Sequence, residues 1–486
     1  MTDPTTIDST LAPEHLREPP GLTFTVLWHP DLSRVGASAA APFARASLSR
    51  KQPVFSDGSP LADARVSRSP LRFFPAGAGI TVRPERPGQR FVIDGQPGVD
   101  GMKLSAAQLS AGVIVGLGRQ GPLVLVESDQ RTPLPARHGL VGSSAAMDRV
   151  RSLIRRFAPH NHPVLIVGPT GTGKEVVCRA LHAASLRSDA PLVGVNMATL
   201  SPGTANSELF GHARGSFTGA TAAVPGLFVQ ADGGTLLLDE VGACSVDVQA
   251  HLLRTLETGT IRPVGGRERA VDVRLLAATD AHLDKAISAG QFRSALYYRL
   301  AHCRIELPAL AARKADIIVQ FLHFLHPALG TPLPTDDGEP WLSRHTAMQL
   351  LRHPWPGNTR QLRAMAHQAA ILYGDVPVCG PLALEAPAEA PDSPGAPPQS
   401  EDARVLAALT ACDYRIREAS ETLGVSRNTL RRKMAAMAIP RAQDLTEAQI
   451  QRVWSDSTDI PTAARALRVS AHGLKLRITE LGLSAD

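Results

Sequence analysis

The segment Gly168–Lys174 (GPTGTGK) combines glycines with a terminal lysine. Glycines let a backbone wrap around an anion, successive N–H groups and a helix N-terminus attract it, and a lysine ammonium reaches its outer phosphates. The segment follows the apolar run HPVLIVG and opens a helical pattern, which is the context that a phosphate-binding loop requires. The alternative is a glycine-rich turn without a ligand. The candidate nucleotide-binding residues are Gly168, Pro169, Thr170, Gly171, Thr172, Gly173, Lys174 and Glu175, the last of which stands where the general motif has a Ser or Thr for Mg²⁺.

A pair of carboxylates at the end of an apolar run supplies the second half of a hydrolytic site. The run GGTLLLDE ends in Asp239 and Glu240. A carboxylate at a strand end can hold the hydration shell of Mg²⁺ while its neighbour polarises an attacking water. The alternative is a pair of acids that cap a helix after a buried strand. Next to a phosphate-binding loop, the pair predicts a metal site at Asp239 and water activation at Glu240.

The chain that must position these residues is long enough for several domains. With 486 residues it exceeds what one hydrophobic core can bury. Short alternating runs between Leu22 and about Glu127, separated by turn residues, predict a β-sandwich. From about Leu140 strands alternate with amphipathic helices, which predicts an α/β nucleotide-binding domain. Residues 381–400 are rich in Pro, Ala and Ser and predict an extended linker, and the pattern beyond them is helical.

Composition excludes several classes of protein. A hydrophobic fraction of 43% with 20% charged residues is typical of a globular chain rather than a disordered one. The 5 cysteines are widely spaced and never form a C-x-x-C pair, which argues against a disulfide framework or a zinc site. The N-terminus has no signal-like pattern, and no apolar run approaches membrane-spanning length. We therefore expect a soluble, cytoplasmic protein with no membrane partner.

The basic C-terminal segment REASETLGVSRNTLRRKM predicts a DNA-binding helix-turn-helix. Its apolar positions form the inner face of two helices, with Gly424 in the turn and Ser426 as the cap of the second helix. The start of that helix can reach base edges, and the later basic residues suit phosphates of double-stranded DNA. A solvated basic helix is the alternative. A related pattern at Thr462–Ile478 lacks the turn glycine and is either a second DNA contact or a packing element. The predicted DNA-binding residues are Arg427, Asn428, Arg431, Arg432 and Lys433.

Five segments occur in the order seen in sigma-54-dependent transcriptional activators, the enhancer-binding proteins. They are GPTGTGKE, ELFGHARGSFTGA (Glu208–Ala220), GGTLLLDE, LYYRL (Leu296–Leu300) and WPGNTRQL (Trp355–Leu362). The resemblance runs from about Leu140 to Tyr373, and the helix-turn-helix is similar to the Fis type common in this family. It implies an AAA+ ATPase with ATP and Mg²⁺ as cofactors. A Glu after the loop lysine is usual in that family.

The resemblance also assigns roles to matching residues. Glu240 would be the catalytic base, and Asn196 would be the switch that holds it in an inactive pose, with a turn or cap asparagine as the alternative. Arg293 and Arg299 match arginine fingers that reach the nucleotide of the neighbouring subunit, which implies a homo-oligomer, a hexameric ring. An intramolecular salt bridge is the alternative for these arginines. Arg360 matches the sensor arginine of the helical lid.

The segment GSFTGA (215–220) implies the macromolecular partner. In the family this loop contacts the sigma factor and transmits ATP-driven movement to the sigma-54 RNA polymerase holoenzyme, so Phe217 and Thr218 are the predicted contacts. Ser216 replaces the usual Ala, and a tight turn that buries Phe217 is the alternative. Asp280 replaces the usual sensor asparagine. An acid there repels the γ-phosphate unless it is turned away, which puts the turnover rate in question more than ATP binding.

The N-terminal β-rich region ends in LSAAQLSAGVIVGLGRQGPLVLVE, which is similar to the closing strands of forkhead-associated domains. Such domains bind phosphothreonine proteins, for which Arg34, Ser67 and Arg68 are the candidates here, although Pro70 stands where the family has His. A scaffold for protein contacts is the alternative. The expected multidomain organisation is a flexible N-terminus (1–20), a forkhead-associated-like β-sandwich (21–132), an α/β AAA+ P-loop ATPase core (138–310) with a helical lid (311–379), a linker (380–400), an all-α Fis-type helix-turn-helix (401–440) and a possible second helix-turn-helix (441–486).

Together these features predict a regulator that binds upstream DNA and uses ATP hydrolysis to convert a closed promoter complex into an open one. A DNA-binding regulator with a silent AAA+ domain is the alternative, with Asp280 as a sign of decay. An AAA+ chaperone or protease partner with an incidental helix-turn-helix is the third hypothesis. The GSFTGA loop, the finger arginines and the Asp-Glu pair favour the first over the second, and the DNA-binding unit counts against the third.

Overall fold

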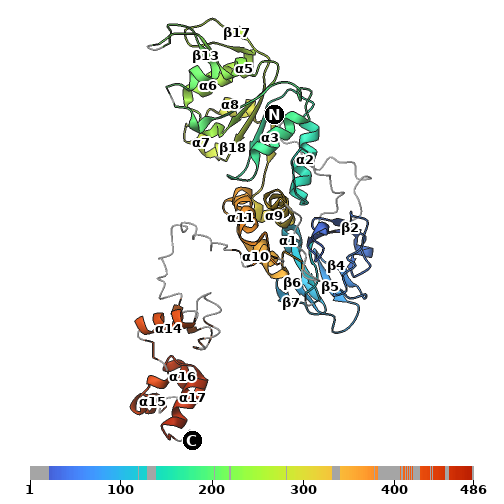
Figure 1. Cartoon of the computed structure of the whole chain (residues 1–486), viewed down its shortest axis with the longest axis vertical. Coiled ribbons are helices and arrows are strands. Elements are labelled where there is room, and N and C mark those ends of the chain that lie inside the picture. The colour runs from blue at the N-terminus through green and yellow to red at the C-terminus, as the bar shows by residue number, and fades with distance from the viewer. Residues whose placement is uncertain are drawn as a thin grey trace. The chain divides into compact units, whose positions relative to one another are not determined.

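The computed structural model forms two compact units, Met1–Pro387 and Ala388–Asp486. It describes residues 21–118, 120–128, 138–201, 203–217, 220–280, 282–330, 340–376, 378–380 and 382 of the first unit. In the second unit it describes residues 405–406, 409–410, 412, 414, 416, 419, 427–437, 439–440, 442–454 and 459–483. Figure 1 shows the elements of both units, each of which is described by itself. Among the described residues no helix is both long and apolar enough to span a membrane.

The first unit begins with two antiparallel sheets that pack on a common core, named here the sandwich. One sheet has the order β2-β1-β10-β9-β6-β7 and the other β3-β4-β5-β8. Alternation along β1 sends Leu22, Phe24 and Val26 into this core, where Phe24 meets Phe73 of the opposite sheet at 5.3 Å between ring centroids. The antiparallel strands confirm the predicted β pattern, whereas the likeness to forkhead-associated domains stays a prediction. The strands are β1 (Gly21–Trp28), β2 (Ser38–Pro42), β3 (Ser47–Leu48), β4 (Leu71–Ala76), β5 (Gly79–Pro84), β6 (Phe91–Ile93), β7 (Gln96–Pro97), β8 (Met102–Leu104), β9 (Val113–Leu117) and β10 (Leu123–Glu127), with helix α1 (Ala106–Ala111) before β9.

A parallel α/β domain follows, as the alternation of strands and helices predicts. Its five-stranded sheet has the order β12-β15-β18-β11-β19, and all its pairs are parallel. Strands buried on both faces read as continuous apolar runs, and TLLLD of β15 is an example. The strands are β11 (Val164–Val167), β12 (Leu192–Asn196), β15 (Thr235–Asp239), β18 (Arg274–Thr279) and β19 (Cys303–Glu306). The helices are α2 (Ala145–Phe157), α3 (Lys174–Ala183), α4 (Ala205–Phe210), α5 (Leu227–Gln230), α6 (Val246–Thr258), α7 (Leu283–Ser288) and α8 (Ser294–Leu300).

A helical lid completes the first unit, with α9 (Lys314–Leu329), α10 (Arg344–Arg352) and α11 (Asn358–Tyr373). A fully buried carboxylate, Asp316, ties α9 to the α/β domain. It accepts hydrogen bonds from the backbone N–H groups of Ser143 and Ser144, both at 2.7 Å, and from the Ser144 hydroxyl at 2.8 Å. Ser144 caps the N-terminus of α2, and Arg313 lies 3.7 Å from the same carboxylate. Lid and core therefore share one buried polar network.

Replacing Asp316 by Ala is expected to lower the free energy of unfolding by about 3–5 kcal/mol, because the buried Arg313 guanidinium loses its counter-charge. The matched control is Asp272→Ala, which breaks the ion pair with Arg187 at a carboxylate that is 78% exposed. That control should cost at most about 1 kcal/mol. Urea titration followed by tryptophan fluorescence checks both values, and equal losses would contradict the buried-network interpretation.

The second unit is helical. Ala419 and Leu430 are buried in one cluster with Met434, as the predicted inner face requires, whereas Leu423–Ser426 lie outside the described residues. A second cluster holds together the next helices, and the turn between α16 and α17 contains Arg468 with a φ of +57° where the first motif has Gly424. Ser470 caps α17 by accepting from the Gly473 N–H. The helices are α14 (Arg427–Ala436), α15 (Glu447–Trp454), α16 (Ile460–Ala466) and α17 (Ala471–Glu480).

Candidate functional site

The loop 168–174 joins β11 to α3 at the carboxyl edge of the parallel sheet. Gly171 and Gly173 have left-handed φ values of +77° and +104°, a conformation that lets a glycine-rich loop aim backbone N–H groups at an anion. The Lys174 ammonium is buried, donates to the Gly168 carbonyl at 3.0 Å and lies 3.7 Å from a Glu240 carboxylate oxygen. The loop thus presents donors and one cation at a single point, which is the chemistry that a polyphosphate requires.

The ends of the neighbouring strands bring the predicted carboxylates to the same edge. Asp239 ends β15, and its register partner Asn196 ends the adjacent β12. Glu240 follows with a left-handed φ of +53°, a conformation that a non-glycine residue keeps only where its surroundings impose it. Lys174, Asp239 and Glu240 are therefore brought together as the sequence predicts. Asp280 follows β18 and adds a third acid that faces the loop.

Asp280 turns its side chain toward the loop threonine. Its carboxylate accepts from the Thr170 hydroxyl, and its backbone N–H points to Glu240 at 3.4 Å. The hydrogen bond from Thr170 lowers the pKa of Asp280. Burial raises the pKa of Glu240, the neighbouring Asp280 raises it further, and Lys174 opposes both. A charged Asp280 thus favours the protonated form of Glu240, the residue predicted to act as a base.

The side chains of two predicted site residues, Glu175 and Asn196, bond to neighbouring residues outside the nucleotide site. Glu175 binds Arg179 at 2.7 Å on the exposed surface of α3. The Asn196 side-chain oxygen accepts from the Ala198 N–H at 2.9 Å. This is the geometry of a capping asparagine, which the sequence analysis gave as the alternative to a switch. Its role as a switch stays a prediction.

The lid contacts the loop directly through the start of α11. Arg360 donates its backbone N–H to the Gly171 carbonyl at 3.3 Å, while its side chain is exposed. The Asn358 amide donates to the Thr170 carbonyl at 2.9 Å and accepts from the Leu310 N–H at 2.8 Å. Asn358 is a positioning residue that sequence analysis missed, although it lies two positions before the predicted sensor Arg360.

A small pocket of about 90 Å³ beside Gly173 was also missed. It lies between the segment before α2, the start of α3 and the lid helix α9, and most of its lining is apolar. In the sequence, the two apolar residues Val176 and Val177 shortly after the loop could have indicated an apolar pocket there. The apolar lining residues are Leu140, Val141, Met147, Val176, Val177, Leu307 and Phe324.

Comparison with known proteins assigns the chain to a family. Residues 140–306 match the model of the Sigma-54 interaction domain, and residues 396–437 match that of the bacterial regulatory protein, Fis family. The transcriptional regulatory protein ZraR of Salmonella typhi is 42% identical over 308 residues, which cover 62% of this chain and 69% of that protein. The chain belongs to the sigma-54-dependent transcriptional regulators.

Further relatives are similar over the same extent. The DNA-binding transcriptional regulator NtrC of Rhizobium meliloti is 36% identical over 358 residues, which cover 65% of this chain and 72% of that protein. A crystal structure of NtrX from Brucella abortus in complex with ATP is 34% identical and covers 62% of this chain and 70% of that chain, with a TM-score of 0.46. Neither family match includes the sandwich.

In this sigma-54-dependent regulator the described part of the GSFTGA segment, residues 215–217 and Ala220, lies next to two short hairpins. One is formed by β13 (Gly211–His212) and β14 (Val224–Pro225), the other by β16 (Thr260–Ile261) and β17 (Arg269–Ala270), and a bridge between His212 and Val264 connects them. Phe217 is 49% exposed and rests on the His212 ring at 5.0 Å. The alternative that buries Phe217 is therefore wrong. Thr218 lies outside the described residues.

The candidate finger arginines of this regulator lie at the two ends of α8. Arg293 precedes the helix, and its side chain donates to the Val246 carbonyl at 3.4 Å. Arg299 donates to the Leu256 carbonyl at 3.1 Å and lines a pocket of about 350 Å³. Both side chains are exposed, and among the described residues neither forms an ion pair. The salt-bridge alternative is not supported, and their action in a neighbouring subunit stays a prediction.

The DNA-binding candidates lie on α14. Arg431 and Arg432 are exposed and Lys433 is half-buried, while Leu430 and Met434 face the core. The side chains of Arg427 and Asn428 lie outside the described residues, although α14 begins at Arg427, as the predicted second helix requires. Arg431 and Arg432 thus face solvent on this helix.

The assignment of Arg34 to a bound phosphate is not retained. Its guanidinium is buried, pairs with Asp57 at 2.9 Å and donates to the carbonyls of Leu61 and Ser59 at 2.8 and 3.0 Å. These internal bonds occupy the group that a ligand would need. Ser67 is half-buried and Arg68 is exposed, and both lie on the loop between β3 and β4.

Proposed function

We propose that this regulator binds upstream double-stranded DNA as a hexamer and uses ATP hydrolysis to remodel the sigma-54 RNA polymerase closed complex into an open complex. The observation that carries the proposal is the convergence of Lys174, Asp239 and Glu240 at one sheet edge, in a domain that also presents the exposed Phe217. A silent AAA+ domain has no need of this geometry. A family member with it is expected to turn ATP over.

The loop residues would bind and orient the triphosphate. Lys174 would bind the β- and γ-phosphates, and Glu240, 3.7 Å from it, would take a proton from the attacking water. The donor set fits Mg²⁺, since the Asp239 carboxylate at the end of β15 would supply an oxygen ligand, and Mg²⁺ in such sites needs only one or two carboxylates besides substrate oxygens and water. When bound, Mg²⁺ neutralises charge that develops on those phosphates. The apolar pocket beside Gly173 is suited to the adenine ring.

Open-complex formation tests the proposal. Full-length protein is incubated with a sigma-54 holoenzyme and a supercoiled promoter, and single-stranded bases are mapped with permanganate. Wild type should open the promoter only with ATP. Phe217→Ala should hydrolyse ATP and leave the promoter closed. If wild type binds DNA but neither hydrolyses ATP nor opens the promoter, the silent-domain alternative replaces the proposal.

Asp280→Asn is expected to move the acid limb of the pH–rate profile for ATP hydrolysis to lower pH. A raised pKa keeps Glu240 protonated, and unable to accept a proton, over a wider acid range. Removing the Asp280 charge lowers that pKa, so the rate in mildly acid buffer rises. Asp284→Asn, at an exposed acid of α7, is the control. An unmoved limb in Asp280→Asn would show that this carboxylate does not act on the base.

Arg432→Ala is expected to weaken binding to a DNA duplex and to reduce the slope of log affinity against log salt by about 1, because one phosphate contact releases about one counter-ion. Lys285→Ala removes one exposed charge from α7 and serves as the control. Fluorescence anisotropy over a salt series measures both. Equal salt slopes for Arg432→Ala and wild type would show that α14 is not part of the DNA interface.

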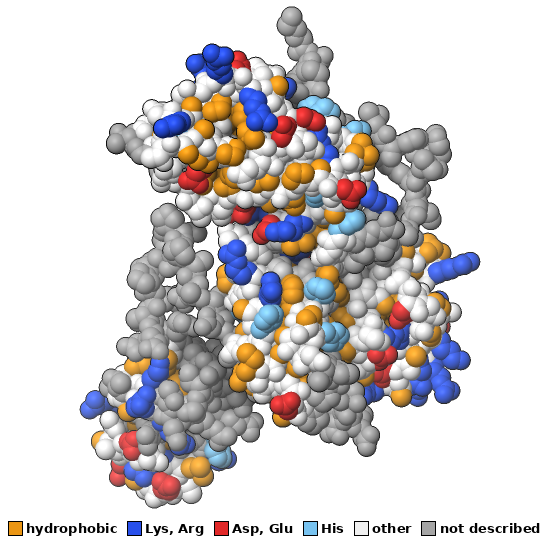
Figure 2. Space-filling view, turned by 45° about the horizontal axis from the view of Figure 1, so that its top comes forward, with side chains coloured by type: hydrophobic (Ala, Val, Ile, Leu, Met, Phe, Trp, Pro, Cys, Tyr) orange, Lys and Arg blue, Asp and Glu red, His pale blue; other side chains and the backbone are white. Residues whose placement is uncertain are grey.

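We also propose that the sandwich binds a phosphothreonine protein. A pocket of about 430 Å³ is lined by Ser67 and four arginines, and none of the described residues that line it is acidic. Arg50 donates its backbone N–H to the Ser67 carbonyl at 2.9 Å, while its guanidinium donates to the carbonyls of Val66 and Ala64, so the phosphate would fall to the other arginines. Figure 2 shows Lys and Arg side chains gathered at one edge of the sandwich. Anisotropy with phosphothreonine and threonine peptides tests this, and equal binding of both would refute it. The four arginines are Arg50, Arg65, Arg86 and Arg90.

A further inference from the structure

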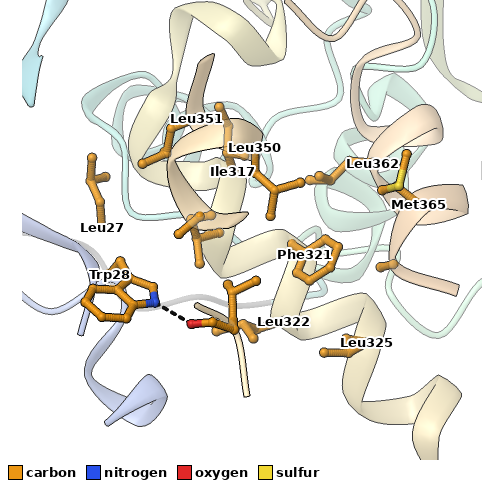
Figure 3. Close-up of a cluster of buried hydrophobic side chains, with 14 of the residues drawn as sticks. Leu27, Trp28, Ile317, Phe321, Leu322, Leu325, Leu350, Leu351, Leu362 and Met365 are labelled. Carbon is orange, nitrogen blue, oxygen red and sulfur yellow. Dashed lines mark hydrogen bonds between the residues drawn. The ribbon is translucent and has the colours of Figure 1, made fainter. Parts of the chain in front are cut away.

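The outer face of one sandwich sheet is buried against the lid. The register of β1 shifts between Val26 and Trp28, and this bulge lets two consecutive residues, Leu27 and Trp28, join the core of the lid. Both are 1% exposed, and the Trp28 indole N–H donates to the Leu342 carbonyl at 2.7 Å (Figure 3). Ile114, Leu123 and Leu125 from β9 and β10 complete this surface, named here the seam.

Polar contacts and close backbone approach flank the seam. The Lys314 ammonium at the start of α9 donates to the Gly112 carbonyl at 2.9 Å, and Arg352 of α10 donates to the Asp94 carbonyl at 3.4 Å. Gly36 has a φ of +92°, and a Cβ there would lie 2.7 Å from the Ser143 hydroxyl. Interfaces between domains of one chain are commonly small and polar, which permits relative motion. This one is apolar and close-fitting, so we expect sandwich and lid to move as one body.

The same lid helix reaches the nucleotide site from its other side. Arg313, next to Lys314, donates to the Thr172 carbonyl of the phosphate-binding loop at 2.9 Å. Gln320, one to two turns further along α9, accepts from the Thr359 hydroxyl at the start of α11. That start carries the contacts of Asn358 and Arg360 with the loop. One helix therefore lies between the seam and the loop, with polar contacts to each.

We propose that the sandwich is a positioning element of the nucleotide site: through the seam it holds the lid so that α9 and α11 keep their contacts with the loop. The proposal rests on the proposed function for its effect on ATP. Trp28 acts through the lid and touches no reacting atom. An event at the sandwich, such as binding a partner, thereby reaches the loop through α9.

Hydrogen exchange of the nucleotide-free full chain tests the seam without reference to activity. In Trp28→Ala the amide of Arg360, which donates to the Gly171 carbonyl, should exchange roughly tenfold faster than in wild type. Trp28→Phe keeps an aromatic ring and should give a smaller increase. Phe74→Ala, at a side chain of β4 that is 44% exposed, is the matched control and should exchange as wild type does. Unchanged exchange in a folded Trp28→Ala protein would overturn the proposal.

Kinetics supply the second readout. Trp28→Ala should raise the KM for ATP roughly tenfold with kcat within about twofold of wild type, because the reacting groups are untouched. Trp28→Phe should restore most of the KM. If Trp28→Ala does not fold, Lys314→Met removes the hydrogen bond to the Gly112 carbonyl beside the seam and is scored by the same exchange and KM measurements. A wild type that hydrolyses no ATP would refute the proposed function alone, whereas equal KM values in active wild type and a folded variant would refute the positioning role.

Discussion

Glu240→Gln is expected to slow ATP hydrolysis by roughly a hundred- to ten-thousand-fold while leaving nucleotide binding near that of wild type. The amide keeps the size of the side chain but cannot accept a proton from water. Lys174, 3.7 Å away, remains to bind phosphate. Single-turnover phosphate release measures the rate, and titration with a fluorescent nucleotide measures binding. The variant should also leave a sigma-54 promoter closed.

The matched control is Glu306→Gln, since Glu306 ends β19 at the same edge of the sheet but is exposed and beside Arg304. It should hydrolyse ATP at the wild-type rate. A Glu240→Gln protein that keeps more than about a tenth of the wild-type rate would place the base elsewhere, since general-base catalysis contributes at least about a hundredfold. Loss of binding together with hydrolysis would instead show that Glu240 supports the loop.

The nucleotide site was predictable because its parts are local in sequence. The loop lies between an apolar run and a helix, and the Asp239–Glu240 pair directly follows another apolar run. In a parallel sheet the carboxyl ends of strands share one edge, so spacing along the chain was sufficient to bring them together. Phe217 was predictable for a similar reason, because the glycines around it indicate a surface loop.

Features made by distant contacts were not predictable. Thr170 and Asp280 are 110 positions apart, and only the fold shows that the Asp280 side chain turns toward that threonine. Trp28 and Leu342 are 314 positions apart, and nothing in the alternation of β1 distinguishes a tryptophan of the seam from one of the sandwich core. The bulge in β1 directs Trp28 into the seam rather than into the sandwich core, and a β-bulge has no clear sequence signature.

Arg34 shows how a residue type can mislead. An arginine in a loop near β1 is a reasonable phosphate ligand, and Asp57, which occupies it, is 23 positions away. The arginines of the pocket come from two loops, 49–70 and 85–90, and only the folded chain brings these loops together beside Ser67. The choice between a buried structural arginine and a ligand-binding one depends on such partners rather than on composition.

Arg299→Ala is expected to reduce ATP hydrolysis by roughly a thousandfold or more in the homogeneous protein, as loss of an arginine finger does. Arg299 is exposed, donates one hydrogen bond to the Leu256 carbonyl and has no carboxylate partner among the described residues, so its other N–H groups can meet a nucleotide from another subunit. Lys174→Ala should be equally inactive for a different reason, because its own loop no longer binds the outer phosphates. Steady-state phosphate release measures each variant.

Mixing these two inactive proteins decides whether the finger acts between subunits. In a mixed ring, an Arg299→Ala subunit with an intact loop can lie next to a Lys174→Ala subunit with an intact finger, and that interface has every group the reaction needs. Activity should therefore return to a substantial fraction of wild type. Lys174→Ala mixed with Glu240→Gln is the matched control, because both changes disable the site of their own subunit and no arrangement restores it. Recovery in the first mixture alone requires a shared site, and a shared site makes the oligomer the catalytic unit; failure of both mixtures, with assembly intact, would return Arg299 to a role within its own chain.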